Sequence, residues 1–263
     1  MVLYVIGRVD LLNAPCFAVV GSRNATPQGV RDAQEFSHAL SDAGLTIVSG
    51  LALGIDAAAH RGGLAGSASS IAVLGTGADR IYPRRNVPLA ADLAARGAIV
   101  SEFPLGTPPR AENFPRRNRL ISGLSRGVLV VEAALASGSL ITAHEAADQG
   151  RDVFAMPGPI HSPVSRGCNG LIKEGAALVE AVGDILEELR IVDSTPNPRR
   201  PAAQRCRKDQ RIVLDAMGYA PVTIDTISAA CGRDVAEVSA QLSELELAGH
   251  VARVAGGLFQ RMA

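Results

Sequence analysis

The chain has 263 residues, 47% of them hydrophobic, and its 26 basic and 26 acidic side chains give a formal net charge of zero at pH 7. This composition excludes a disordered chain and suffices for one large and one small domain. A membrane-spanning helix needs roughly 20 apolar residues, which no run reaches. The N-terminal MVLYVIGRVD also lacks the features of a signal peptide. We therefore expect a cytoplasmic protein, and its four widely spaced cysteines favour free thiols over a disulfide framework.

Short apolar runs alternate with amphipathic segments between residue 17 and about residue 189. Strands are predicted at 17–20, 45–49, 70–74, 98–101, 128–132 and 152–156, because these runs are short, apolar and rich in β-branched residues. Helical spacing occurs between them, for example at 29–42, 87–95 and 140–149. The alternation predicts an α/β domain over residues 1–191 with a parallel sheet and helices on both faces.

The remainder of the chain differs in character. Residues 192–205 are polar and rich in proline, which predicts a linker. Residues 206–263 then show three helical segments and two short apolar runs separated by Gly256 and Gly257. That order predicts a small C-terminal winged-helix domain.

Glycine-containing turns follow several of the predicted strands. Gly21, Ser22 and Arg23 follow the first strand, Gly50 and Gly54 the second. Ser137 and Gly138 open a helix after the 128–132 strand. The carboxyl ends of parallel strands share one edge of a sheet, where the N–H groups of helix N-termini bind anions, so these turns predict a phosphate site. Glycines that serve only tight βα turns are the alternative.

Arginines gather in the middle of the neutral chain. Residues 79–126 hold nine arginines against four acids. The two densest parts, DRIYPRRN and FPRRNR, each combine an aromatic residue, a proline, paired arginines and an asparagine. Cations follow a phosphate backbone while an aromatic face stacks on a base, so the pattern predicts a groove for single-stranded nucleic acid. The alternative is a solvated arginine face or salt bridges to helix acids.

Two further side chains could share a helix face. Asp56 and His60 are four residues apart, and the sequence offers no third metal ligand nearby. We therefore expect a hydrogen-bonded structural pair instead of a metal site. No phosphate-binding GxxxxGK[ST] loop occurs. No catalytic, cofactor-binding or metal-binding residue is predicted.

Six blocks of the sequence, taken in order, resemble the DNA processing protein A (DprA/Smf) family. They are GSRNATPQG, SGLALGIDAAAHRGGL, VLGTGADRIYPRRN, SEFPLGTPPRAENFPRRNRLISGLS, VVEAALASGSLITAHEAADQGRDVFAMPGPI and GCNGLIKEGA. The resemblance implies an extended Rossmann-like domain that binds and protects single-stranded DNA during natural transformation. It also implies loading of the RecA recombinase and a homodimer formed through that domain.

The resemblance and the glycine and arginine patterns together give the expected DNA-binding residues. They are Ser22, Arg23, Gly50, Gly54, Arg84, Arg85, Asn86, Phe114, Arg116, Arg117, Asn118, Arg119, Ser137 and Gly138. In this interpretation the stretch from Asn113 to Gly127 forms one wall of a DNA groove.

Two features depart from the family pattern. Many members carry a helical domain before the sheet, whereas this chain begins within the LYVIGR block. The predicted recognition helix of the winged-helix domain contains no lysine or arginine but has acidic residues at 234, 237, 244 and 246. Such a helix would repel phosphates, so we expect it to bind a partner or regulate the dimer.

Two enzyme classes are alternatives to a non-enzymatic DNA-binding protein. Nucleoside-phosphate N-glycosidases of the lysine-decarboxylase-like class use a related fold and a glutamate near a PGGxGT loop, but Glu132 precedes SGS and no PGG is present. A dinucleotide-dependent oxidoreductase would need GxGxxG, where this chain has GSRNATPQG. Single-stranded DNA binding is therefore the preferred function, and the N-glycosidase is the alternative.

Overall fold

The computed structural model describes residues 2–191, 207–254 and 256–262, apart from the side chain of Lys208. The chain forms two compact units, one around a large sheet and one from the C-terminal helices and strands. The linker predicted at 192–205 lies outside the described residues. Within the described part, no helix is both long and apolar enough to cross a membrane.

The first unit is built on an eight-stranded sheet with the order β1-β5-β4-β3-β2-β6-β7-β8. All neighbours are parallel except β1, which pairs antiparallel with β5 at one edge. The strands are β1 (Tyr4–Gly7), β2 (Cys16–Val20), β3 (Thr46–Ser49), β4 (Ser70–Val73), β5 (Ala98–Ser101), β6 (Gly127–Val130), β7 (Asp152–Ala155) and β8 (Ala177–Leu178). The strand order reverses direction between β2 and β6, which are neighbours in the sheet but distant in sequence.

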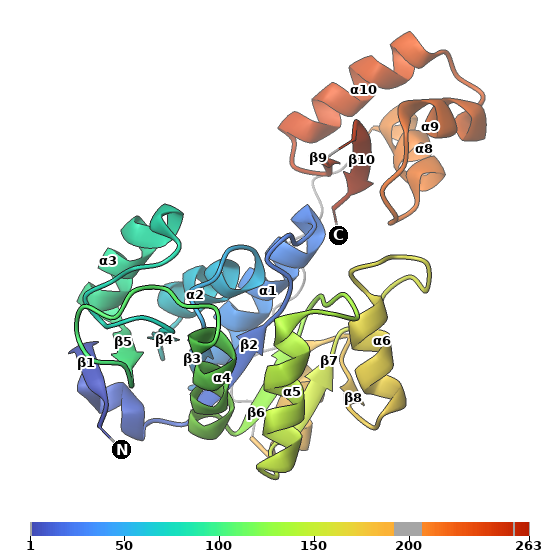
Figure 1. The fold of residues 1–263 in the computed structure, drawn as a ribbon. Helices are drawn as coiled ribbons and strands as arrows, with labels where there is room; N and C mark the ends of the chain where they lie inside the picture. The colour runs from blue at the N-terminus through green and yellow to red at the C-terminus, as the bar shows by residue number, and fades with distance from the viewer. Residues whose placement is uncertain (1, 192–206, 255, 263) are drawn as a thin grey trace. The chain divides into compact units, whose positions relative to one another are not determined.

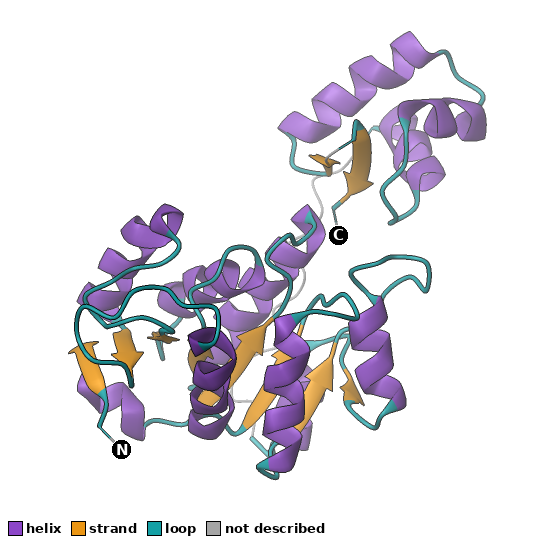
Figure 2. Ribbon diagram, viewed as in Figure 1, coloured by secondary structure: helices purple, strands orange, loops and turns teal. Residues whose placement is uncertain are grey.

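Helices cover both faces of this sheet, as the alternation predicts (Figures 1 and 2). On one face lie α4 (Asn113–Leu124), α5 (Gly138–Asp148) and α6 (Arg166–Lys173). On the other lie α1 (Pro27–Asp42), α2 (Ile55–Ala65), α3 (Val87–Arg96) and α7 (Val182–Glu188). Two short 3₁₀ helices, η1 (Val9–Asn13) and η2 (Arg84–Asn86), complete the unit.

The side chains of β2 alternate between two apolar cores. In β2, Ala18 and Val20 pack under α4, α5 and α6, whereas Phe17 and Val19 pack against α1 and α2. The predicted strands read as continuous apolar runs because both faces of the parallel sheet are covered. The fully buried Phe17 and Phe154 rings lie with their centroids 5.7 Å apart in the second core.

The second unit has the predicted winged-helix composition. Its helices are α8 (Lys208–Met217), α9 (Ile224–Cys231) and α10 (Val235–Leu247), and its wing is the antiparallel pair β9 (Val251–Val254) and β10 (Leu258–Arg261). A separate core that includes Val213, Ile227 and Leu242 stabilises it. This unit therefore has the apolar interior of an independent domain.

The expected groove wall is the main difference between sequence and structure. We predicted that the stretch from Asn113 to Gly127 would present its arginines together along a wall, but residues 113–124 form α4. Consecutive residues of a helix point in different directions, about 100° apart. The arginines at 116, 117 and 119 therefore have three different surroundings.

Candidate functional site

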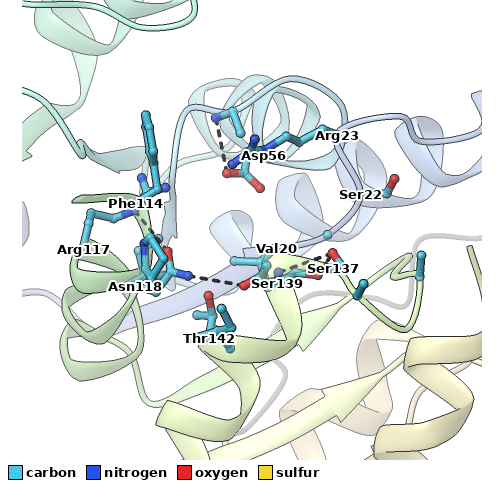
Figure 3. Close-up of a pocket in the computed structure, with 18 of the residues that line it drawn as sticks. Val20, Ser22, Arg23, Asp56, Phe114, Arg117, Asn118, Ser137, Ser139 and Thr142 are labelled. Carbon is cyan, nitrogen blue, oxygen red and sulfur yellow. Dashed lines mark hydrogen bonds between the residues drawn. The ribbon is translucent and has the colours of Figure 1, made fainter. Parts of the chain in front are cut away.

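A pocket opens at the carboxyl edge of the sheet, beside the ends of β2 and β6. Its volume is about 720 Å³, within the range of small-molecule sites. The turn after β2, the loops before α4 and α5, and these two helices line it, together with side chains from α2 and from the loops after β3 and β4. Figure 3 shows the facing side chains of this main pocket. It lies where the strand order reverses, which is where open α/β sheets bind ligands.

Backbone hydrogen bonds fix the turn after β2. The N–H of Ser22 donates to the carbonyl of Glu132 over 2.7 Å, and the carbonyl of Ser22 accepts from the N–H of Ile55 over 3.1 Å. Gly54 has a positive φ of 73°, and a Cβ there would lie 2.2 Å from the Ser22 carbonyl oxygen. The close approach of the two loops therefore requires glycine at position 54.

An arginine and two aromatic rings form one rim of the main pocket. The guanidinium carbon of Arg23 lies 5.9 Å from the centroid of the Phe114 ring. The Phe114 ring in turn lies 5.7 Å from the Tyr82 ring, centroid to centroid. Arg23 and Tyr82 are exposed and Phe114 is half-buried. A guanidinium and two aromatic rings, whose planes are inclined by 42°, therefore lie on the same rim of the pocket.

Arg117 is buried beneath the pocket, with a residue exposure of 5%. Its guanidinium donates to the carbonyl of Gly50, the residue after β3, over 2.7 Å, and to the carbonyl of Val73, the last residue of β4. A Cβ on Gly50 would lie 2.5 Å from that guanidinium. Burial lowers the pKa of Arg117 to about 10, with nearby Asp56 opposing the shift and Arg23 adding to it. The group stays charged at neutral pH, so its cation lies under the pocket and joins two strand ends.

Asp56 and His60 do not form the expected hydrogen-bonded pair. The carboxylate of Asp56 accepts from the backbone N–H groups of Gly50 and Ala52 over 3.1 and 3.3 Å. Nδ1 of His60 lies 2.7 Å from the hydroxyl of Ser70. Both residues are on the buried side of α2, but each reaches a different strand end or loop. The i,i+4 spacing therefore places the two side chains on one helix face, but they do not hydrogen-bond to each other.

Asn86 also differs from the expected exposed groove residue. It is only 3% exposed, and its side-chain amide donates to the carbonyls of Leu51 and Ala52 over 2.9 and 3.0 Å. Leu51 has a positive φ of 57°, an uncommon conformation for a branched side chain. Asn86 and Asp56 therefore hold the loop after β3, and Asn86 has no amide proton left for a ligand.

The N-terminus of α5 forms the opposite rim. Ser137 caps the helix by accepting from the N–H of Ser139. The side-chain amide of Asn118 donates to the carbonyl of Gly138 over 3.3 Å, which connects α4 to α5. The first N–H groups of a helix have no intrahelical partner and carry a partial positive charge, so this rim favours an anion.

The other predicted arginines lie at three places around the pocket. Arg84 and Arg85 are exposed in η2 and do not line it. Arg116 is exposed on α4, with its guanidinium carbon 5.9 Å from the centroid of the Phe103 ring. Arg119 is 44% exposed and forms an ion pair with Glu102. The pocket therefore brings together Ser22, Arg23, Phe114, Arg117, Asn118, Ser137 and Gly138.

The chemistry of the pocket suits an anion attached to a flat ring. Arg23 and the α5 N-terminus attract negative charge, while Phe114 and Tyr82 offer faces for stacking. The carboxylate of Glu132 lies against the backbone of Gly29 and is not among the residues that line the pocket. Among the described residues, no three His, Cys, Asp or Glu side chains are grouped to hold a metal ion.

Sequence reasoning missed several pocket residues. Tyr82, Asn24, Ile141 and Thr142 line the pocket but were not predicted as site residues. Tyr82 had a signal, since it precedes the paired arginines of DRIYPRRN. Ile141 and Thr142 had none, because only the orientation of α5 brings its first turn against α4.

Comparison with known protein families gives a match over most of the chain. Residues 1–190 match the family described as DNA recombination-mediator protein A, and residues 196–257 match the DprA winged helix domain. Protein Smf of Escherichia coli is 49% identical over 262 residues, which cover 97% of this chain and 70% of that protein. DNA processing protein DprA of Streptococcus pneumoniae is 46% identical over 188 residues, which cover 72% of this chain and 66% of that protein.

Two experimental structures resemble the sheet unit. The X-ray structure of DNA processing protein A from Streptococcus pneumoniae superposes with a TM-score of 0.68 and 47% identity, over 71% of this chain and 65% of that one. The structure of DNA processing protein A from Helicobacter pylori, described for its single-stranded DNA binding mode, has a TM-score of 0.66 and 30% identity, over 72% of this chain and 86% of that one. Together with the match over residues 1–190, these relatives show that the chain belongs to the DNA recombination-mediator protein A family, the DprA/Smf proteins.

Proposed function

We propose that this chain binds single-stranded DNA at the carboxyl edge of its sheet, with the main pocket as the centre of the site. The contact between the Arg23 guanidinium and the Phe114 ring carries the proposal. It places a phosphate-binding group beside a stacking surface, the combination that a single strand needs and that a closed duplex cannot use fully. The related Helicobacter pylori protein, described for its single-stranded DNA binding mode, supports it.

The predicted site residues take three different roles in this proposal. Ser22, Arg23, Phe114 and the α5 N-terminus at Ser137 and Gly138 contact the strand. Arg84, Arg85, Arg116 and Arg119 extend the positive surface around it, although Glu102 offsets the charge of Arg119. The partly buried Gly54 and the buried Gly50, Asn86, Arg117 and Asn118 position the loops and helices that carry the contacts.

Family membership supports a recombination role for the bound strand. A mediator of recombination must hold single-stranded DNA and deliver it to a recombinase, so we infer that this chain loads RecA during natural transformation. A homodimer formed through the sheet unit would place two such sites on one strand. The acidic residues of α10, including Glu237 and Glu244, favour a protein partner or a regulatory contact for the winged helix over a phosphate backbone.

Binding without catalysis is part of the same proposal. The carboxylate of Glu132, the candidate acid of the N-glycosidase alternative, is packed beside Gly29 in α1 and does not line the pocket. A catalytic carboxylate has to reach the reacting bond. Incubation with nucleoside monophosphates should therefore release no free base, and release of base would favour the alternative.

Fluorescence anisotropy with labelled oligo-dT and a duplex of equal length tests the binding proposal. We expect tighter binding of the single strand. If the site neutralises about five phosphates, log K should fall with log salt with a slope of about −3.5. Equal affinity for duplex, or an affinity independent of salt, would contradict the proposed site.

A further inference from the structure

A second, smaller pocket lies behind the wall of the main pocket. This side pocket has a volume of about 340 Å³ and is lined by Glu102, Phe103, Pro104, Thr107, Arg110, Asn113 and Arg116. Neither the arginine pattern nor the resemblance to the family assigned a role to Arg110, Glu102 or Phe103. Its volume is close to the lower end of the range for small-ligand sites.

The two pockets share one wall, which consists of the loop before α4 and the first turn of that helix. Along this segment Pro109, Ala111 and Phe114 line the main pocket, whereas Arg110 and Asn113 line the side pocket. Neighbouring residues of this wall thus line opposite pockets. A chain of nucleotides that leaves the main pocket over this wall reaches the side pocket next.

The side pocket has a cationic and aromatic lining. Arg110 and Arg116 are exposed, and the guanidinium of Arg116 lies over the Phe103 ring. A guanidinium plane with a ring behind it can take a base on its open side, because bases stack on arginine planes as well as on aromatic rings. Arg110 also lines the side pocket, where its guanidinium is placed to attract a phosphate.

A buried acceptor completes the set of contacts. Glu102 is 11% exposed, and one of its carboxylate oxygens accepts from Arg119. The other oxygen, Oε1, is buried and has no hydrogen-bond partner among the described residues. A buried acceptor without a donor is costly, and because Glu102 lines the side pocket, a shift of its carboxylate on binding would let this oxygen accept from an N–H group on the edge of a nucleobase.

We propose that the side pocket is a second nucleotide subsite, which binds the next part of the strand held in the main pocket. Arg110 contacts a phosphate, Arg116 stacks on a base, and Glu102 accepts from the edge of that base. This inference rests on the proposed function and adds a direction to it: the strand runs from the main pocket over the 109–116 wall toward β5.

The length of the oligonucleotide tests the second subsite. The double variant Arg110→Ala/Arg116→Ala should bind oligo-dT of about twelve nucleotides about tenfold more weakly than the unchanged protein, because two cationic contacts are lost. An oligo-dT of about four nucleotides, which the main pocket alone can hold, should bind both proteins within about twofold. Both side chains are exposed, so the melting temperature should not change.

A matched control removes the same charge elsewhere. Arg126 and Arg151 are exposed and precede β6 and β7, at the opposite edge of the sheet. Arg126→Ala/Arg151→Ala should leave both oligonucleotide affinities within about twofold, since surface charges beyond a Debye length are screened.

Three outcomes would overturn the second subsite. They are an equal loss on both lengths of oligonucleotide, no loss on either, and an equal loss in the control variant. If the unchanged protein binds neither oligonucleotide, the proposed function itself fails. That result is distinct, because it appears before any variant is compared.

Discussion

Replacing Arg117 by alanine should destabilise the sheet unit far more than an exposed arginine variant would. The change removes the guanidinium that donates to the carbonyls of Gly50 and Val73 and that contacts the side chain of Asn118. Both carbonyls lie at buried strand ends and would lose their charged donor. The space occupied by the long side chain would also become a cavity.

The size of the effect follows from these contacts. A hydrogen bond to a charged group contributes about 1.5–3 kcal/mol, and two buried carbonyls lose one each. Removing the cation also recovers part of the cost of burying it, which is the cause of the lowered pKa of Arg117. Asp56, however, would lose a neighbouring positive charge. We expect a net loss of about 3–5 kcal/mol in the free energy of unfolding, the range for breaking buried charged contacts.

Urea denaturation followed by circular dichroism measures this loss. The two units can unfold separately, so the transition of the sheet unit has to be fitted by itself. Arg117→Lys keeps the positive charge but lacks the planar guanidinium group that reaches two carbonyls. It should therefore be more stable than Arg117→Ala but less stable than the unchanged protein. If Arg117→Ala changes the unfolding free energy no more than Arg126→Ala does and yet abolishes DNA binding, Arg117 is a DNA contact and not a positioning residue.

Three further predictions follow from the same geometry. Arg23→Ala should cost about 1.5–3 kcal/mol of oligonucleotide binding by anisotropy with an unchanged melting temperature, whereas an equal loss in Arg126→Ala would indicate diffuse attraction. Burial, with the charges of Arg117 and Arg61, lowers the pKa of His60 from 6.5 to about 3. As the pH falls, His60 therefore takes up a proton in the unfolded state before it does so in the folded state. The unfolding free energy should be constant above pH 6.5 and fall by about 2 kcal/mol by pH 5. His60→Gln should flatten this part of the curve, and an unchanged slope would exclude His60 as the cause of the loss. Burial raises the pKa of Asp56, so the titration of Asp56 changes the unfolding free energy in the opposite direction. Removing residues 203–263 should leave oligonucleotide affinity within a few-fold, and loss of binding by a folded truncated protein would place the winged helix in the site.

Much of the fold is determined by local sequence pattern. The six predicted strands appear as β2 to β7 with ends that differ by at most two residues, because continuous apolar runs flanked by turns have few other stable arrangements in water. β1 and β8 were not predicted. Each lies at an edge of the sheet, where partial exposure weakens the apolar pattern.

The sequence also determines where the site lies. Glycine and serine turns after β2, β3 and β6 predict an anion site at the carboxyl edge, since parallel strands bring those turns to one side of the sheet. The pocket at the ends of β2 and β6 contains several of these predicted residues, including Arg23, Phe114 and Ser137.

Only the tertiary structure decides what each arginine does. In the sequence, the arginines at 116, 117 and 119 form one cluster, but α4 sends them to different surroundings. Arg116 lies over Phe103, Arg117 is buried against the ends of β3 and β4, and Arg119 pairs with Glu102. Clustering in sequence predicts net local charge, which acts over several ångströms regardless of direction. A hydrogen bond requires a partner within about 3 Å at a defined angle, and that depends on how the packed helix is oriented against the sheet.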